Sequence, residues 1–342
     1  MKRKLFLASV SIEHFCIDLL CIYTLSNLVR SGTFSLDAII VIYFLYNLIA
    51  FGTQFIWGYL LDKYRLEKYI LVASGLIVIV GFILLNFSQL AAVIIIALGN
   101  ALFHVSAGSI VLQSFKNKYA PIGIFIAPGA IGVLLGSYSM SAGIGWGIPI
   151  GLVIIILSVI VFALNKKLKS SALATPAKPI RLGPILIILA AIALRAFVGS
   201  VTIFPWKSAV DLLWLLTIAV AFGKAIGGII ADKIGWSKVV TISIIIAIPM
   251  LIFNTLPILG IIGSLLLNIT TAITVILLFK ELPNMPSLTF GLTCLALLIG
   301  GIPVYFPAVK SFFNNSAYAP IGLLLTLIIF IIFYKKYNNH EK

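Results

Sequence analysis

The chain has 342 residues, of which 62% are hydrophobic and only 10% are charged, and its formal net charge is +15. A water-soluble domain carries charged residues at about 25%, so this composition excludes an ordinary soluble enzyme or binding domain. The three cysteines, Cys16, Cys21 and Cys294, lie within apolar runs without metal-ligand spacing, and we expect them to be small buried hydrophobic residues.

The chain divides into about twelve apolar runs, each near the length of about 20 residues that crosses a bilayer as a helix. The first run follows a basic N-terminus and has no signal-peptide cleavage pattern, so we expect an uncleaved first span. The pattern predicts an all-α polytopic membrane protein. The predicted spans are 5–27, 38–61, 69–87, 91–112, 122–141 and 145–164, followed by 184–204, 210–230, 238–255, 258–279, 286–306 and 318–334.

A polar stretch at 166–183 predicts a linker between an N-terminal half, 1–165, and a C-terminal half, 184–342. Cytoplasmic loops of membrane proteins carry an excess of lysine and arginine. With a cytoplasmic N-terminus, 19 of the 24 basic residues fall in cytoplasmic segments, and outside loops hold only Arg30, Lys207 and Lys310. We therefore expect both termini and the linker in the cytoplasm, and a multi-pass protein of the cytoplasmic membrane. The basic charge then reflects topology and not nucleic-acid binding.

Two segments at corresponding places in the two halves match at an offset of 170 residues. Each has a glycine, then an aspartate and a lysine, at the cytoplasmic end of a predicted span. Glycine permits close helix approach, and aspartate at the membrane boundary can pair with lysine and cap the N-terminus of the next helix. The matched residues are Gly58, Asp62 and Lys63 in the first copy and Gly228, Asp232 and Lys233 in the second.

This repeated Gly-x-x-x-Asp-Lys pattern resembles motif A of the major facilitator superfamily of transporters. The second copy is the closer match, with Gly235 after its lysine, whereas the first copy has Tyr64-Arg65 there. The resemblance implies two six-helix halves related by a pseudo-two-fold axis, with spans one, four, seven and ten lining a central cavity. It also implies secondary active transport by alternating access, in which the halves rock about a midplane site.

A narrower resemblance, to the fosmidomycin-resistance branch of drug exporters, rests on four patterns. The chain departs from that branch at Val105-Ser106-Ala107, where the branch has proline and an acidic residue. The resemblance favours export, although proton-driven export and proton-coupled uptake both fit the sequence. The four patterns are His14-Phe15-x-x-Asp18, Gly58-Tyr59-x-x-Asp62, Phe103-His104, and the glycine row Gly129, Gly132 and Gly136.

Ionisable side chains inside a bilayer are costly, so those within the predicted spans are candidates for function. His14 and Asp18 are four residues apart and share a helix face, where the pair can hold and release a proton near neutral pH. A structural hydrogen bond is the alternative. Glu13 lies about 100° around the helix from His14 and can face a neighbouring helix. We expect Asp18 or Glu13 to carry protons, and we prefer Asp18 because of its histidine neighbour.

Polar residues of the fourth and seventh spans extend this set. Asn100 and His104 form a second pair at a spacing of four, and the resemblance brings His104 toward Asp18. It also places Arg195 on the opposite wall of the cavity. An arginine there suits an anionic substrate through bidentate hydrogen bonds, and a locking charge pair with Asp18 or Glu13 is the alternative.

One further pair is related by the internal repeat. Lys224 occupies the position of Gln54 in the second copy. A lysine at this depth can take part in transport, or it can extend its ammonium group to the membrane interface.

We expect a proton-coupled secondary transporter of a small molecule, acting as a monomer in the lipid bilayer. A transport-inactive sensor or scaffold is one alternative. An intramembrane enzyme that uses His14, Asp18 and His104 with a metal is another, although it gives the duplicated motif no role. No Walker sequence is present, and the glycines at 143–147 lack the context of a phosphate-binding loop, so ATP cannot drive the chain directly. We expect no cofactor and no resident metal.

Overall fold

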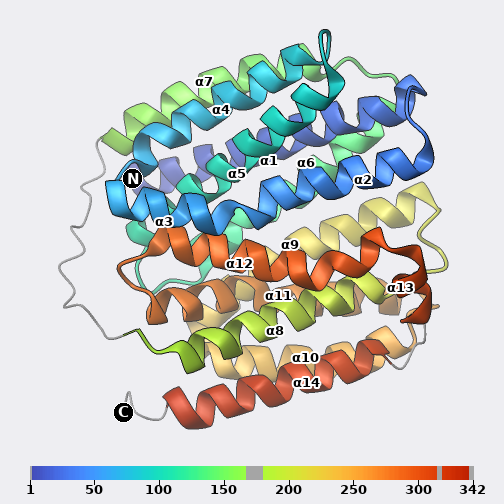
Figure 1. Cartoon of the computed structure of the whole chain (residues 1–342). Helices are drawn as coiled ribbons and strands as arrows, with labels where there is room; N and C mark the ends of the chain where they lie inside the picture. Colours follow the sequence, from blue (N-terminus) through green and yellow to red (C-terminus); the bar gives the residue numbers. More distant parts are fainter. Residues whose placement is uncertain (1, 167–179, 314–317, 339–342) are drawn as a thin grey trace. The chain divides into compact units, whose positions relative to one another are not determined.

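The computed structural model describes residues 2–166, 180–313 and 318–338, and all regular structure within these ranges is helical (Figure 1). Most of the predicted linker lies outside the described residues, so the domain boundaries drawn from it stay a prediction.

The first seven α-helices correspond to the first six predicted spans. A π-helical turn, η1 (Leu48–Gly52), separates α2 from α3, so the predicted second span consists of three consecutive helical segments. Such turns add a residue to the helix and shift the side chains that follow it. The helices are α1 Lys2–Ser31, α2 Leu36–Asn47, α3 Gln54–Tyr64, α4 Glu67–Leu84, α5 Gln89–Ser114, α6 Ala120–Ser141 and α7 Gly147–Lys166.

The remaining helices supply the other six predicted spans in order. Pro257 begins α11, and Pro303 lies in a 3₁₀ turn, η2 (Ile302–Tyr305), that follows α12, so both prolines mark helix ends. The short helix α13 lies between the last two predicted spans, and the sequence pattern does not predict it. The helices are α8 Leu182–Val201, α9 Val210–Ile234, α10 Trp236–Ile252, α11 Pro257–Glu281, α12 Pro286–Gly301, α13 Pro307–Phe312 and α14 Tyr318–Phe333, which a π turn, η3 (Tyr334–Asn338), extends.

These helices have the length and surface of membrane spans. Among the described residues, eleven helical segments are long and apolar enough to cross a bilayer, and α10 is a shorter apolar helix of 17 residues. One face of α7 leaves Leu152, Ile156 and Val159 between 57% and 63% exposed, which is costly in water but favourable in lipid. The predicted all-α, multi-pass membrane architecture of about twelve spans is confirmed.

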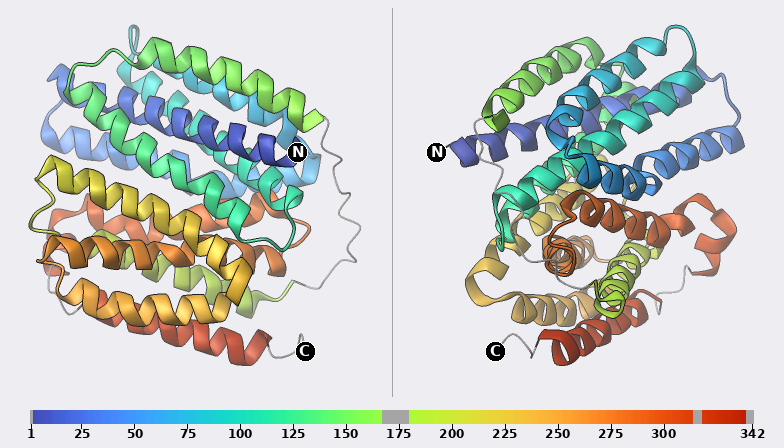
Figure 2. Two further views of the ribbon diagram at one scale, coloured as in Figure 1. Left: turned by 180° about the vertical axis from the view of Figure 1, so that it is seen from behind. Right: turned by 60° about the vertical axis from the view of Figure 1, so that its left-hand side comes forward.

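The chain forms two compact units. The first contains Met1–Lys116, Pro128–Ala174 and Met285–Cys294, and within it α1 and α4 each pack against both α5 and α7 (Figures 1 and 2). The second contains Asn117–Ala127, Thr175–Asn284 and Leu295–Lys342, and within it α11 packs against α8, α9 and α10 while α14 packs against α8 and α10. The first unit thus includes the start of α12, and the second includes the start of α6.

Candidate functional site

Four polar side chains of α1 and α5 meet inside the first unit; we refer to His14, Asp18, Asn100 and His104 as the α1–α5 cluster. The Nε2 atoms of His14 and His104 are 2.8 Å apart. One Asp18 oxygen lies 3.2 Å from His14 Nε2, and the other lies 3.7 Å from His104 Nε2 and accepts a 2.9 Å hydrogen bond from Asn100 Nδ2. The side chains of His14, His104 and Asp18 are only 4%, 8% and 13% exposed.

The short contact between the two imidazole groups requires a hydrogen atom between their nitrogens. His104 Nδ1 lies 2.9 Å from the backbone oxygen of Asn100, and since a carbonyl oxygen only accepts, Nδ1 carries the hydrogen. A neutral His104 therefore presents the lone pair of Nε2 to His14 Nε2. Two imidazole nitrogens 2.8 Å apart repel unless a hydrogen lies between them, so His14 Nε2 donates, or one added proton is shared beside the Asp18 carboxyl group.

The same atoms also form a candidate set of metal ligands. The donor atoms of His14, Asp18 and His104 lie within 4.8 Å of one another, and two imidazoles with one carboxylate are a ligand set that transition metals use. Two imidazole nitrogens on a tetrahedral ion, with bonds of about 2.0–2.1 Å, stand roughly 3.3 Å apart. The 2.8 Å separation in this structure is that of a hydrogen bond, and it is shorter than the spacing on a tetrahedral ion.

Helix α6 closes one side of the cluster through glycine. A Cβ atom on Gly129 would lie 2.4 Å from an Asp18 oxygen and 2.5 Å from His14 Nε2. One and two turns further on, Cβ atoms on Gly132 and Gly136 would lie 2.3 Å and 2.5 Å from the backbone oxygens of Phe15 and Leu19. The glycine row therefore lets α6 pack directly on α1, and only Gly129 adjoins the ionisable groups.

Glu13 faces away from the cluster. It is fully buried, its Oε1 accepts a 2.6 Å hydrogen bond from Ser158 of α7, and a Cβ atom on Gly75 of α4 would lie 3.8 Å from that oxygen. Its Oε2 has no hydrogen-bond partner among the described residues. The structure thus gives the two acidic residues of α1 different neighbours, and sequence reasoning did not find Ser158.

Three further candidates are not part of this cluster. Arg195 on α8 is 7% exposed, its Nε has no hydrogen-bond partner, and it forms no ion pair with the described residues of the second unit. Lys224 on α9 is half-buried, and its backbone oxygen packs against Gly123 of α6. Gln54 is fully buried at the start of α3 and donates a 2.6 Å hydrogen bond to the oxygen of Ala50.

The aspartates of the repeated motif cap helices that are distant in sequence. Asp62 accepts hydrogen bonds of 3.0 and 2.8 Å from the backbone N–H groups of Ser287 and Leu288, at the start of α12. Asp232 accepts bonds of 2.9 and 3.0 Å from those of Tyr119 and Ala120, at the start of α6. The expectation that each caps the next helix was therefore wrong. Sequence spacing cannot reveal this partner, because it lies 112 to 226 residues away.

The glycines of the motif make this capping possible. A Cβ atom on Gly58 would lie 2.5 Å from the backbone oxygen of Ser287, and one on Gly228 would lie 2.5 Å from that of Tyr119. Each glycine is four residues before its aspartate and hence on the same helix face. The motif thus brings a helix start against the glycine, where the aspartate carboxylate meets its free N–H groups and its positive dipole end.

In both copies the residue that follows the helix has a positive φ. Gly235 follows α9 with φ +88°, and its repeat equivalent, Arg65, follows α3 with φ +59°. Glycine adopts positive φ without steric cost, whereas a residue with a side chain loses roughly 1 kcal/mol there. Lys63 and Lys233 are exposed, and Lys63 stacks over the Tyr64 ring instead of pairing with Asp62.

Solved structures identify this architecture, although no family model and no curated protein match the sequence. A bacterial homologue of the iron transporter ferroportin aligns over 97% of this chain and 100% of its own, with a TM-score of 0.65 and 12% identity. The FucP transporter of the major facilitator superfamily aligns over 94% and 98%, with values of 0.66 and 14%. The human organic anion transporter MFSD10 aligns over 97% and 99%, with values of 0.68 and 12%.

The chain has the major facilitator fold. At these identities the likeness concerns the fold and not the substrate, and the narrower resemblance to the fosmidomycin-resistance branch stays a prediction. Within the major facilitator fold of this chain, the first and fourth spans, α1 and α5, carry the α1–α5 cluster, and the seventh span, α8, carries Arg195.

Proposed function

We propose that this protein is a secondary active transporter that moves a small molecule across the cytoplasmic membrane by alternating access. The major facilitator fold supports this proposal. The solved structures named above are those of transporters, and the chain aligns with them over nearly their whole length. The expected orientation, with both termini in the cytoplasm, rests on the distribution of lysine and arginine. The resemblance to an exporter branch favours export.

The α1–α5 cluster is the proposed proton-coupling site, and the 2.8 Å contact between two imidazole nitrogens beside a carboxyl group is the observation that carries it. The cluster lies within two predicted membrane spans, where ionisable groups are costly and therefore usually have a function. Histidine is also the side chain that ordinarily titrates nearest neutral pH. FucP, one of the similar structures, is a fucose:proton symporter.

Arg195 is the proposed recognition group for an anionic part of the substrate. A buried guanidinium group without a counter-charge is costly, and a carboxylate or phosphonate on the substrate would supply two hydrogen bonds in a planar arrangement. MFSD10, another similar structure, is an organic anion transporter.

A thermal-unfolding screen of the purified protein, at two pH values, tests this substrate class. Small carboxylates and phosphonates are the probes, and neutral amides of the same size are their matched controls. Saturation at about 100 times Kd adds roughly 2.7 kcal/mol of stability, which is a clear rise in Tm. We expect Arg195→Gln to abolish the rise and Arg195→Lys to retain part of it. Equal stabilisation of the wild type by the neutral amides would contradict an anionic substrate.

The repeated motif is the proposed conformational switch, because its aspartates bind the starts of α6 and α12 and do not contact the cluster. We expect Asp232→Asn to slow transport by about two- to tenfold, since the amide loses the charge that holds the α6 N-terminus and keeps only one strong acceptor. Substrate affinity should stay within a few-fold of wild type.

The equivalent variant, Asp62→Asn, should behave in the same way through α12. Transport rates and equilibrium binding of the same labelled substrate separate the two effects. A large loss of binding affinity in a folded Asp232→Asn protein would place substrate recognition at the motif instead.

A further inference from the structure

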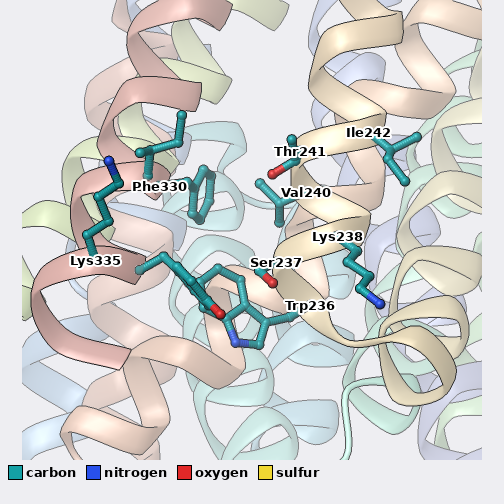
Figure 3. A pocket seen from close by; sticks show the side chains of 10 residues that line it. Trp236, Ser237, Lys238, Val240, Thr241, Ile242, Phe330 and Lys335 are labelled. Carbon is teal, nitrogen blue, oxygen red and sulfur yellow. The ribbon is translucent and has the colours of Figure 1, made fainter. Parts of the chain in front are cut away.

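A cavity of about 450 Å³ opens between the first turns of α10 and the end of α14 (Figure 3). Its inner part is aromatic: Trp236 is 8% exposed, and its ring lies 6.4 Å from that of Phe330 and 5.8 Å from that of Tyr334. The hydroxyl groups of Ser237 and Thr241 also line it. Tryptophan and tyrosine are typical of the membrane–water interface, where their surroundings are apolar on one side and polar on the other. Such a cavity suits a ligand with one apolar end and one polar end.

The mouth of this cavity is flanked by two lysines, which extend from its opposite edges (Figure 3). Lys238 of α10 and Lys335 of η3 are both exposed and line it, and the described lining residues include no acidic side chain. Lys238 lies in the first turn of α10, which has neither an acidic residue nor a side-chain cap, so the helix dipole adds to the positive field. An anion is the complement of this mouth.

The walls of the cavity continue into the lipid-facing surface. Ile242 and Ile331 line it and are 52% and 42% exposed, and Ile245 and Ile328, one turn deeper in the membrane, are 51% and 50% exposed. An apolar strip therefore runs from the cavity along both helices. A small soluble anion would leave this strip unused, whereas an acyl chain would cover it.

We propose that this cavity binds an anionic glycerophospholipid of the cytoplasmic leaflet. Lys238 and Lys335, at opposite edges of the cavity, attract the anionic headgroup between them, the aromatic part takes the glycerol region, and an acyl chain follows the apolar strip along α10 and α14. The distribution of basic residues puts this end of the helices on the cytoplasmic side, where anionic lipids gather and basic pockets between spans recognise their headgroups. The site is separate from the transport function proposed above.

Quenching of tryptophan fluorescence by brominated lipid tests this site in the full chain. Bromine on an acyl chain quenches only at contact, and the difference between wild type and Trp236→Phe reports Trp236. In phosphatidylcholine nanodiscs, brominated phosphatidylglycerol should quench Trp236 at a mole fraction at least about fivefold lower than brominated phosphatidylcholine. Each lysine near the membrane surface increases the affinity for an anionic lipid by roughly fivefold.

Charge variants separate a specific site from general attraction. Lys238→Gln with Lys335→Gln should remove the preference, and the arginine pair at the same positions should keep it. Lys116→Gln with Lys118→Gln, two exposed lysines outside the cavity, should also keep it. Retention of phosphatidylglycerol by these proteins in native mass spectrometry gives a second measurement that needs no change at Trp236.

Three results would overturn the lipid site. Equal quenching by the two lipids would remove its charge selectivity, and a preference that survives in the glutamine pair would remove the lysines from it. Reversal of the quenching by millimolar glycerol 3-phosphate would assign the cavity to a free phosphate compound.

Discussion

Replacing Asp18 by asparagine is expected to abolish accumulation of substrate driven by a proton gradient, while exchange of substrate across the membrane continues. Asparagine keeps the shape of the side chain and can still accept from Asn100, which donates to Asp18 over 2.9 Å. It removes the negative charge beside the two imidazole groups, so the proton they share loses its counter-charge. Accumulation in proteoliposomes should fall to the level of liposomes without protein.

Glu13→Gln is the matched comparison for this variant. Glu13 is also a buried carboxylic acid of α1, but it binds Ser158 and not the cluster. We expect the glutamine variant to accumulate substrate, since an amide can accept the same hydrogen bond. If Asp18→Asn accumulates substrate with unchanged pH dependence and Glu13→Gln does not, the coupling proton belongs to Glu13.

Replacing Gly129 by alanine is expected to have a comparably large effect on coupling without removing an ionisable group. The added methyl group would overlap an Asp18 oxygen and His14 Nε2, so the cluster has to open. Overpacking of this kind costs about 1–3 kcal/mol of stability. Coupled accumulation should be lost in protein that remains folded, as judged by size-exclusion chromatography and thermal unfolding.

Two other glycines serve as controls for this variant. Alanine at Gly132 meets the Phe15 backbone and not the cluster, so it should lower stability to a similar extent but leave coupling intact in the folded fraction. Alanine at Gly151 of α7 has no atom within 4 Å, so it should be neutral or slightly stabilising. Loss of coupling in Gly132→Ala as large as in Gly129→Ala would reduce the role of Gly129 to helix packing.

The spans were predictable because a bilayer imposes a simple length and polarity on each helix. Details inside the spans were not predictable in this way. The π turn at Leu48–Gly52 has no proline and no break in hydrophobicity, and α10 is as apolar as its neighbours although it is shorter. Pro128 lies within α6 and does not end it. Membrane-spanning helices tolerate proline, because neighbouring groups can bond the backbone oxygen that proline leaves without its usual partner.

The site was predictable only in its local part. The spacing of His14 and Asp18, and that of Asn100 and His104, follows from helix periodicity. The contact between these two pairs is a tertiary contact between residues 82 to 90 positions apart in the sequence. Only the resemblance to a transporter superfamily predicted it. Side-chain partners such as Ser158, and the helix starts bound by Asp62 and Asp232, carry no signal of their own, because a serine or a backbone N–H group is common everywhere.

Proton movement that accompanies substrate movement is the most direct test of the central claim. The protein would be reconstituted into weakly buffered liposomes that contain a pH-sensitive dye, and a substrate gradient would be imposed at equal internal and external pH. A coupled transporter predicts an internal pH change that needs the substrate gradient, saturates with substrate concentration and is absent in Asp18→Asn. Substrate flux in the wild type without any pH change, and with the same rate in Asp18→Asn, would contradict the assignment of the α1–α5 cluster as the coupling site.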